Sequence, residues 1–342
     1  MSYQFTILLT FNLALLINGE IMVQQNGSLK ESIKPVLVIH GGAGNITPQH
    51  LDASARVQYE HKLKEALEVG YAILNSGGSG LDAVETTVKI LEDSPLFNAG
   101  KGSVLTMDGK VEMDASVMSG KDLNAGAVAS VRTIKNPISA ARRVMEASPH
   151  VLLVGEGAEQ FSAQQNVEIV SEDYFLTDRR KQELERIKKR KDSDTTGNIH
   201  LSEDLDKYGT VGAVALDKHG NLYAATSTGG MANKKFGRVG DSPIIGAGTY
   251  ASNQTCAVSC TGHGEYFIRL QVAKEVSSLM AYKNMTLKEA SEFVIHNLLD
   301  QLGGTGGLIA VDKHGNVSMP FNTSGMFRGY IKEGKVVVEI FK

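Results

Sequence analysis

Apolar residues along this chain alternate between short continuous runs and longer stretches at helical spacing. The run VLVIH at residues 36–40 ends at a glycine-rich turn and predicts a buried strand. Residues 53–75 carry apolar positions at helical spacing and end just before Gly77 and Gly78. The same reasoning gives further strands at 111–118, 125–131 and 209–216, and further helices at 81–93, 136–147, 265–282 and from the capping box at 286–289.

A small internal repeat indicates antiparallel sheets covered by helices. Residues 212–231 resemble residues 306–326, and each copy reads as strand, Asp-Lys-His-Gly-Asn turn, strand. The glycine of each turn supplies the positive φ of a hairpin. We expect His219 and His314, at the two hairpin tips, to be solvated rather than catalytic.

Two stretches lack the pattern of a packed core. Residues 5–17 are apolar and uncharged, too short to span a bilayer with confidence but suited to the centre of a signal peptide. We therefore expect a signal peptide at 1–19, a polar linker at 20–35 and export; because no Lys or Arg precedes the apolar stretch, a cytoplasmic protein is the alternative. Residues 168–208 include the charged run at 179–194 and predict a mobile, solvated linker.

Composition excludes several classes of function. The 342 residues are 42% hydrophobic and 21% charged, as in a soluble globular protein, and the net charge of −3 disfavours a nucleic acid partner. Cys256 and Cys260 would lie ~13 Å apart on one strand, too far for a disulfide. Metal-binding Cys or His spacing, a Walker loop and a Gly-x-Ser-x-Gly elbow are all missing from the sequence.

The candidate nucleophile is Thr210, which opens a core strand directly after the linker. A threonine hydroxyl is a weak nucleophile, but cleavage of the preceding bond would free an α-amine to act as its base. Such an amine titrates near ~7.7–8.0, which suits proton transfer at neutral pH. Gly209 favours the cut because a residue without Cβ tolerates a strained backbone.

Seven motifs extend this hypothesis to a family. Residues 36–341 resemble the plant-type asparaginase and isoaspartyl peptidase family of N-terminal nucleophile hydrolases. The motifs are HGGAG at 40–44, PLFNAGKGSV at 95–104, GTVGAVALD at 209–217, ATSTGGM at 225–231, GRVGDSPIIGAG at 237–248, SCTGHGE at 259–265 and GGLIAVD at 306–312. The related glycosylasparaginases usually have Asp in place of Gly209 and lack the FNAGKG loop.

The resemblance implies a role for each matching residue. Thr210 is the nucleophile, Thr228 supports it, and Thr261 with the N–H of Gly262 forms the oxyanion hole. The resemblance also implies that Arg238 binds the substrate α-carboxylate and Asp241 its α-ammonium, while Gly264 lines the site and Asn98 lies near the nucleophile. A planar guanidinium suits a carboxylate, and such a pair rejects asparagine inside an ordinary peptide, where both groups are amides.

A monovalent cation is also implied by the resemblance. In the family, backbone carbonyls wrap a sodium ion and brace the loop that carries the residue matching Asn98. The matching positions here are Leu91, Glu92, Ser94, Phe97, Ala99 and Lys101. Many relatives have Cys where Ser94 stands, and a turn without an ion is the alternative.

The family further implies an α+β fold, a four-layer αββα sandwich, with no organic cofactor. Cleavage would give an α subunit, residues 36–209, and a β subunit, residues 210–342, paired as an (αβ)₂ heterotetramer. We expect hydrolysis of asparagine and isoaspartyl dipeptides, with no nucleic acid or membrane partner. A glycosylasparaginase-like enzyme and an uncleaved amino-acid-binding relative are the alternatives.

Overall fold

The computed structural model describes residues 33–193 and 209–342, and twelve strands within them form two sheets. The strands are β1 (Val36–Gly44), β2 (Met113–Ser119), β3 (Ala125–Val131), β4 (Leu152–Val154), β5 (Val211–Leu216), β6 (Leu222–Thr228), β7 (Thr249–Ala251), β8 (Cys256–Gly262), β9 (Gly306–Asp312), β10 (Val317–Ser318), β11 (Gly325–Lys332) and β12 (Lys335–Phe341). The larger sheet has the order β12-β11-β1-β5-β6-β2-β3-β4, and the smaller one β10-β9-β8-β7. Neighbouring strands among the described residues pair antiparallel, except β3 with β4, which are parallel.

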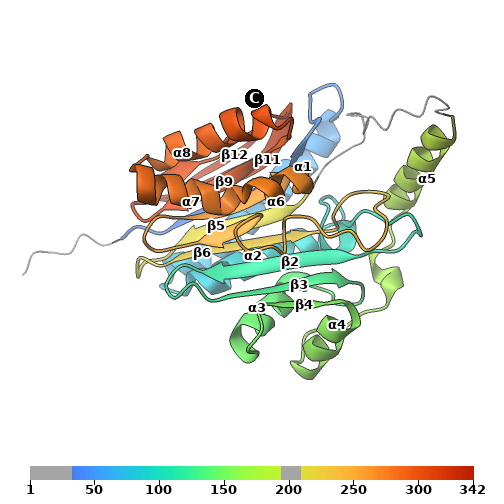
Figure 1. Ribbon diagram of the computed structural model, residues 1–342, viewed down its shortest axis with the longest axis horizontal. Helices are drawn as coiled ribbons and strands as arrows, with labels where there is room; N and C mark the ends of the chain where they lie inside the picture. The colour runs from blue at the N-terminus through green and yellow to red at the C-terminus, as the bar shows by residue number, and fades with distance from the viewer. Residues whose placement is uncertain (1–32, 194–208) are drawn as a thin grey trace, which may run out of the picture. The chain divides into compact units, whose positions relative to one another are not determined.

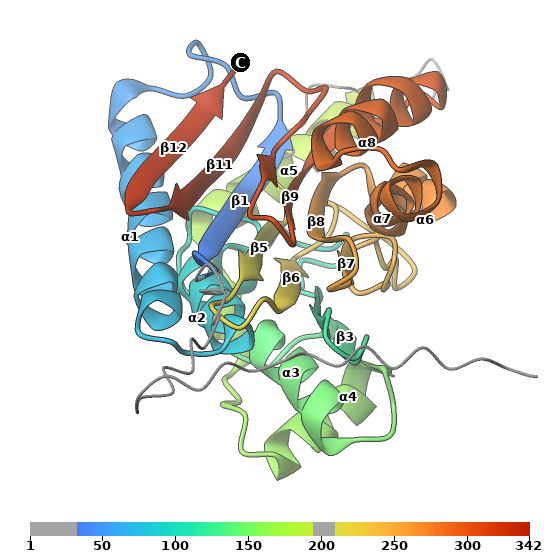
Figure 2. The ribbon, with the colours of Figure 1, turned by 90° about the vertical axis from the view of Figure 1, so that its left-hand side faces the viewer.

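Helices cover the outer faces of both sheets. They are α1 (Ala53–Asn75), α2 (Gly80–Glu92), α3 (Pro137–Ala147), α4 (Gly155–Gln164), α5 (Asp178–Ser193), α6 (Gly264–Leu270), α7 (Val272–Lys283) and α8 (Leu287–Phe293). Two short 3₁₀ helices, η1 (Gly100–Gly102) and η2 (Glu172–Phe175), and one π-helix, η3 (Val294–Leu299), complete the set. Helices α1, α2 and α3 lie against the larger sheet, while α7 and α8 lie against the smaller one (Figures 1 and 2). The layers therefore run helix, sheet, sheet, helix, and the predicted four-layer αββα sandwich is confirmed.

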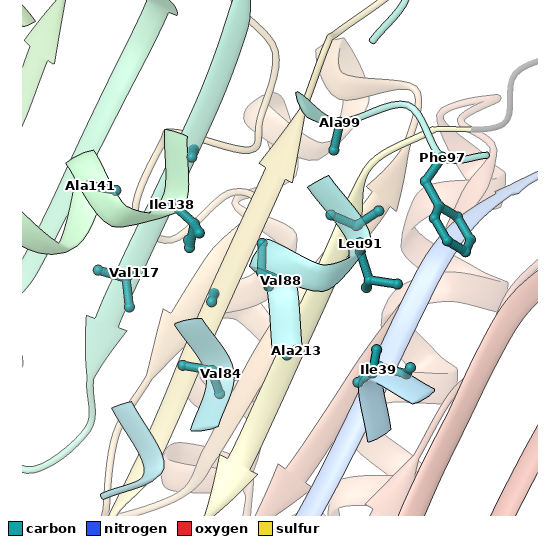
Figure 3. Close-up of a cluster of buried hydrophobic side chains, with 14 of the residues drawn as sticks. Ile39, Val84, Val88, Leu91, Phe97, Ala99, Val117, Ile138, Ala141 and Ala213 are labelled. Atoms are coloured by element: carbon teal, nitrogen blue, oxygen red, sulfur yellow. The ribbon is translucent and has the colours of Figure 1, made fainter. Parts of the chain in front are cut away.

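Strand β1 is apolar throughout because both of its faces are buried. Leu37 and Ile39 pack toward the helices, and Val36 and Val38 pack toward the smaller sheet. Figure 3 shows the helix side of this core, where Val84, Val88 and Leu91 of α2 lie over the strands. A run of consecutive apolar residues is what a strand buried on both faces requires.

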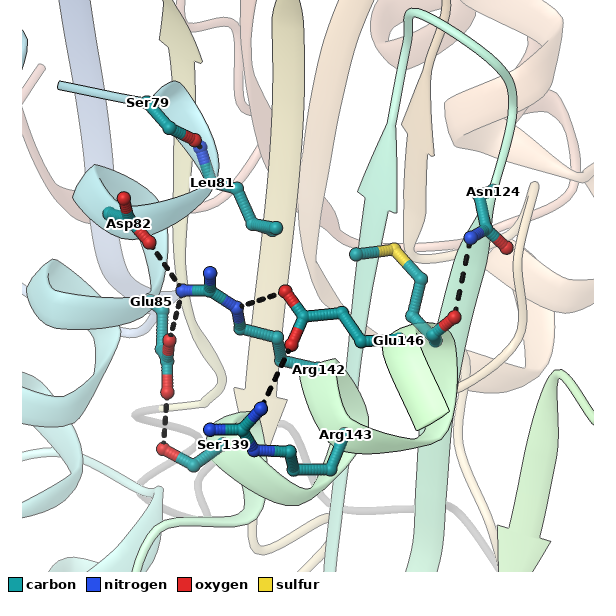
Figure 4. Close-up of polar contacts among 10 residues, drawn as sticks. Ser79, Leu81, Asp82, Glu85, Asn124, Ser139, Arg142, Arg143 and Glu146 are labelled. Carbon is teal, nitrogen blue, oxygen red and sulfur yellow. Dashed lines mark hydrogen bonds and ion pairs between the residues drawn. The ribbon is translucent and has the colours of Figure 1, made fainter. Parts of the chain in front are cut away.

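Helix α3 is fixed to α2 by a half-buried arginine. The guanidinium of Arg142 donates to Asp82 at 2.6 Å, Glu85 at 2.7 Å and Glu146 at 2.8 Å (Figure 4). Ser139 adds a hydrogen bond to Glu85 at 2.6 Å. Helix α2 leads directly into the loop that carries Asn98, so the network fixes the helix from which this loop starts.

One predicted helix is two helices in the structure. The expected helix at 265–282 breaks at Gln271, whose φ of 52° lies in the left-handed region. The break lets Ala273 and Lys274 donate their backbone N–H groups to the carbonyls of Ala247 and Gly246 at 3.1 and 2.8 Å. Satisfying the free N–H groups at the start of α7 outweighs the local strain.

The structure also differs from the expectation of a solvated linker at 168–208. Its first part contains η2 and α5, and Phe175, Leu184 and Ile187 are buried. The few apolar residues in this charged sequence fall on one side of α5, and that side packs against the protein. Residues 194–208 lie outside the described residues, as do 1–32 with the predicted signal peptide.

Candidate active site

Thr210 lies immediately before β5, which runs between β1 and β6 in the larger sheet. Its side chain is buried, and its hydroxyl donates to the Thr228 hydroxyl at 3.1 Å. Thr228 ends β6, the strand paired with β5. The two threonines are brought together because both stand at the same edge of two adjacent antiparallel strands.

The turn after β6 connects Thr228 to Asn98. The N–H of Gly230 donates to the Thr228 hydroxyl at 2.9 Å, and the Asn98 amide donates to the Gly230 carbonyl at 2.8 Å. Asn98 also accepts from the N–H of Val104 at 2.9 Å, which closes its own loop. A Cβ at Gly229 would lie 2.5 Å from the Asn98 side-chain oxygen, so only glycine permits this approach.

The bond between Gly209 and Thr210 is enclosed by two further segments. Gly42 of β1 packs directly on the backbone of Gly209, since a Cβ there would lie 2.8 Å from the Gly209 nitrogen. On another side is the Thr261 hydroxyl, 3.3 Å from the position a Cβ of Gly209 would occupy. This hydroxyl is buried and has no hydrogen-bond partner among the described residues. A buried hydroxyl without a hydrogen-bond partner lowers the stability of the fold by ~1–3 kcal/mol. A functional role for the Thr261 hydroxyl would explain why this cost is tolerated beside the bond between Gly209 and Thr210.

Gly262 follows Thr261 at the end of β8 and has a φ of +152°. A Cβ at this position would lie 2.5 Å from the Thr305 carbonyl oxygen. Both constraints exclude other residues. Glycine therefore ends β8 directly after Thr261, and the oxyanion role of the two residues stays a prediction.

Arg238, Asp241 and Gly264 meet at one point. A Cβ at Gly264 would lie 2.8 Å from Nη2 of Arg238 and 2.9 Å from Oδ1 of Asp241. Arg238 forms a two-point ion pair with Glu265, with distances of 2.9 and 3.0 Å. The absent side chain of Gly264 thus leaves the positive and negative groups side by side, as a site for an amino acid's two charges needs.

Burial dominates the electrostatics of this charged pair. It raises the pKa of Asp241 to about 7, although a backbone hydrogen bond and the nearby Arg238 guanidinium oppose that shift. The Oδ2 atom of Asp241 is buried without a hydrogen-bond partner among the described residues. A carboxylate held in this state would gain from a cationic ligand, because the ligand's charge offsets the lost hydration.

Sequence reasoning assigned no role to His40, the first residue of the HGGAG motif. Its fully buried ring donates from Nδ1 to the Thr210 carbonyl at 3.0 Å, and Nε2 accepts from the Ser259 hydroxyl at 2.9 Å. The carbonyl can only accept, which places the ring proton on Nδ1. Burial lowers the pKa of His40 to about 3, so the ring is neutral and holds the nucleophile's residue in place.

Glu265, Lys234 and Asp114 were likewise not predicted. Burial lowers the pKa of Lys234 and raises that of Asp114, with each group partly opposing the shift of the other. Lys234 donates to the Glu112 carbonyl at 2.8 Å. Only Lys234 lies near Arg238 in the sequence, and a charged residue beside an arginine is typical of a solvated surface; Glu265 and Asp114 come from distant segments.

The predicted cation loop is compact and follows α2. Its turn is closed by hydrogen bonds from Gly102 to the Ala99 carbonyl and from Ser103 to the Gly100 carbonyl, both at 3.1 Å. Gly100, at φ +51°, packs against the carbonyl of Glu92, and Gly102 packs against that of Phe97. The carbonyls of Glu92 and Phe97 therefore lie inside a tightly packed loop, and the cation site itself stays a prediction. In the described part of the chain, no group of three or more His, Cys, Asp or Glu side chains could hold a metal.

Comparison with known proteins decides the family. The sequence profile of the asparaginase family matches residues 33–340. This chain belongs to the asparaginase family. An isoaspartyl peptidase of Escherichia coli K12 is 51% identical over 300 residues, which covers 87% of this chain and 92% of the relative. A putative isoaspartyl peptidase/L-asparaginase of Dictyostelium discoideum is 48% identical over 325 residues, 87% of this chain and 93% of the relative. The human isoaspartyl peptidase/L-asparaginase is 45% identical over 305 residues, 89% of this chain and 95% of the relative.

Membership of the asparaginase family confirms the resemblance noted from the motifs. It makes the chain an N-terminal nucleophile hydrolase, a class that needs no organic cofactor. The roles of individual residues remain predictions. The structure does bring the eight catalytic and substrate-binding candidates into neighbouring positions, because Gly230, which is hydrogen-bonded to Thr228 and Asn98, also lies beside Arg238. Among the described helices, none has the length and apolar character needed to cross a bilayer.

Proposed function

We propose that this chain cuts itself between Gly209 and Thr210 and then hydrolyses asparagine and isoaspartyl dipeptides to aspartate. The observation that carries the proposal is the Thr210 hydroxyl, 3.1 Å from that of Thr228 and beside the unpaired Thr261 hydroxyl. The names of the relatives, isoaspartyl peptidase and L-asparaginase, support the choice of substrate.

Activation is an acyl shift followed by hydrolysis. The Thr210 hydroxyl attacks the Gly209 carbonyl, and its proton passes to the leaving nitrogen as the peptide bond breaks. In this step the Thr261 hydroxyl, which lies 3.3 Å from the position that a Cβ of Gly209 would occupy, would donate to the oxygen that becomes negative. Water then hydrolyses the resulting ester, which leaves a carboxylate on Gly209 and a free amine on Thr210.

Turnover repeats the same chemistry on a substrate. The Thr210 amine accepts the proton of its own hydroxyl as the oxygen attacks the side-chain carbonyl of asparagine. Thr261 and the N–H of Gly262 stabilise the oxyanion, and the protonated amine gives its proton to the departing ammonia or amino group. A water molecule then cleaves the ester on Thr210 and releases aspartate.

Arg238 and Asp241 select the substrate. They would bind the free α-carboxylate and α-ammonium, which asparagine and isoaspartyl dipeptides both carry. A glycosylasparaginase-like activity would use the same pair, and only the space for the leaving group would differ. Comparing rates on isoaspartyl dipeptides and glycosyl-asparagine separates the two activities.

Three finer features belong to the same proposal. A sodium ion would be held by the carbonyls of Leu91, Glu92, Ser94, Phe97, Ala99 and Lys101, where it would brace the Asn98 loop. The cleaved chains would pair as an (αβ)₂ heterotetramer, which sedimentation measures. Residues 1–19 would direct export, and the N-terminal residue of the mature protein reports whether they are removed.

Denaturing gel electrophoresis with mass spectrometry tests the central step. We expect two fragments, the second beginning at Thr210, and a single intact chain from Thr210→Ala. An intact wild-type chain that binds amino acids without turnover would instead indicate the binding relative. Cleavage or hydrolysis by Thr210→Ala would refute the assignment of the nucleophile.

A further inference from the structure

Helix α5 carries a buried arginine in one of the most charged parts of the chain. The Arg180 side chain is 1% exposed, donates from Nε to the Gly102 carbonyl at 2.7 Å, and pairs through Nη1 with Glu183 at 2.7 Å. Removing a guanidinium from water costs several kcal/mol unless its partners are well placed. A side chain that only made α5 soluble would lie on the exposed side, as Arg186 does.

The carbonyl that Arg180 holds belongs to the loop of Asn98. Gly102 donates to the Ala99 carbonyl at 3.1 Å, and two residues later Val104 donates to the Asn98 side chain at 2.9 Å. Arg180 is therefore hydrogen-bonded to the middle of the turn from Asn98 to Val104, which the Asn98 side chain closes.

From this loop, hydrogen bonds continue to the nucleophile. Asn98 donates to the Gly230 carbonyl at 2.8 Å, and the N–H of Gly230 donates to Thr228 at 2.9 Å. Thr228 in turn accepts from the hydroxyl of Thr210 at 3.1 Å. A shift of the loop would thus change the position of the hydroxyl that supports the attacking oxygen.

Other contacts hold the same segment, residues 172–187, which we call the strap. Phe175 is fully buried, and the guanidinium of Arg179 donates to the Tyr59 hydroxyl at 3.2 Å. The ammonium of Lys101, in the Asn98 loop, lies 5.1 Å from the centre of the Tyr174 ring. The strap is thus fastened at several points around the loop, and none of them depends on the bond between Gly209 and Thr210.

We propose that Arg180 is a positioning residue: the strap stays bound after cleavage, and Arg180 keeps the Asn98 loop, and through it Thr228, aligned with the nucleophile. The expected effect of Arg180 on kcat rests on the proposed function, whereas its expected effect on the Asn98 loop does not. The proposal gives residues 172–187, in the C-terminal part of the α subunit, a role in turnover although they lie apart from the reacting atoms.

Kinetics of Arg180→Met test the proposal, with Arg186→Met as the matched control on the exposed side of α5. In the cleaved enzyme, we expect Arg180→Met to lower kcat between about tenfold and a hundredfold, as small misplacements of catalytic groups do. KM should change little because Arg238 and Asp241 are untouched. Arg186→Met should leave both constants at wild-type values; equal kcat values for the two variants would overturn the proposal.

Hydrogen exchange tests the structural part separately. In the uncleaved Thr210→Ala chain, adding Arg180→Met should speed exchange of the amides of residues 102–104 and leave those of β5 unchanged. This result does not need an active enzyme, so it stands apart from any failure of the proposed function. If Arg180→Met yields no folded protein, Arg180→Lys takes its place, with a smaller fall in kcat and faster exchange expected. Wild-type exchange at 102–104 in the folded variant would overturn the proposal.

Discussion

Replacing Thr261 by valine separates the cost of a buried hydroxyl from its use in catalysis. The side chain is fully buried in β8, and its oxygen has no hydrogen-bond partner among the described residues. Valine has nearly the same shape and suits a strand. The substitution therefore removes one polar atom with little other change.

The two expected effects of Thr261→Val have opposite signs. Losing one oxyanion donor costs ~2.7–4 kcal/mol of barrier, so kcat should fall about 10² to 10³-fold. Removing an unpaired buried hydroxyl instead relieves a penalty of ~1–3 kcal/mol, so the free energy of unfolding should stay level or rise. Few substitutions that only damage packing would produce this combination.

The assay compares kcat on asparagine with the denaturant midpoint, for the cleaved fraction of each protein. Thr255→Val is the control, since the Thr255 hydroxyl is buried but lies 2.7 Å from that of Ser277. That variant should lose ~1–3 kcal/mol of stability because Ser277 is left unpaired, and it should keep its kcat. A Thr261→Val enzyme with wild-type kcat would refute the oxyanion role, and one with much lower stability would refute the reading of its hydroxyl as unpaired.

Three further predictions concern the charged groups of the site and its surroundings. Gly264→Ala would place a Cβ 2.8 Å from the Arg238 guanidinium. In steady-state kinetics, KM for asparagine should therefore rise by a larger factor than kcat falls. An unchanged KM would contradict substrate binding beside Gly264. Burial raises the pKa of Asp241 to about 7, so its carboxylate forms as the pH rises through that value. Calorimetry on the cleaved enzyme should therefore find tighter aspartate binding above pH 7 than below it. Asp241→Asn should abolish this pH dependence. Burial likewise raises the pKa of Glu92 to about 8, and a folded-state pKa above the unfolded one means that stability present at low pH is lost as pH rises through about 8. The free energy of unfolding of Glu92→Gln, measured relative to wild type, should therefore be higher at pH 9 than at pH 5. If the two proteins show the same dependence of this free energy on pH, the buried, protonated state of Glu92 is contradicted.

Local pattern was sufficient for most of the first half of the chain. Helix α1 begins and ends where apolar spacing and the following glycines place it, at Ala53 and Asn75. Strand β3, at Ala125–Val131, also matches its expected bounds. Both elements are long or strongly apolar, so their own residues determine their type.

The differences arise where tertiary contacts decide. Nothing local requires a break at Gln271; the reason is the pair of carbonyls at Gly246 and Ala247, more than twenty residues earlier in the chain. Helix α5 has too few apolar residues for its packing to be predicted. The carbonyl that accepts a hydrogen bond from its buried Arg180 belongs to Gly102, in a loop distant in the sequence. Contacts of this kind have no signature in a single sequence.

The candidate site divides in the same way. Thr210 could be proposed from its place before a core strand, and family motifs extended the set to Thr228, Arg238 and Asp241. The role of His40 could not be found, because it depends on the register that sets β1 beside β5 and so brings the ring to the Thr210 carbonyl.

The order of strands in the larger sheet has a consequence for the cut protein. Strand β1, which precedes the scissile bond in the chain, is hydrogen-bonded on one edge to β11 and on the other to β5, and both of these strands follow that bond. Strand β6, which follows it, is likewise paired with β2, which precedes it. Breaking the chain at residue 209 severs one covalent link but interrupts none of these ladders. Separating the two pieces would expose three rows of backbone hydrogen bonds and both cores at once, so the nicked molecule should denature in a single concerted transition instead of shedding a fragment.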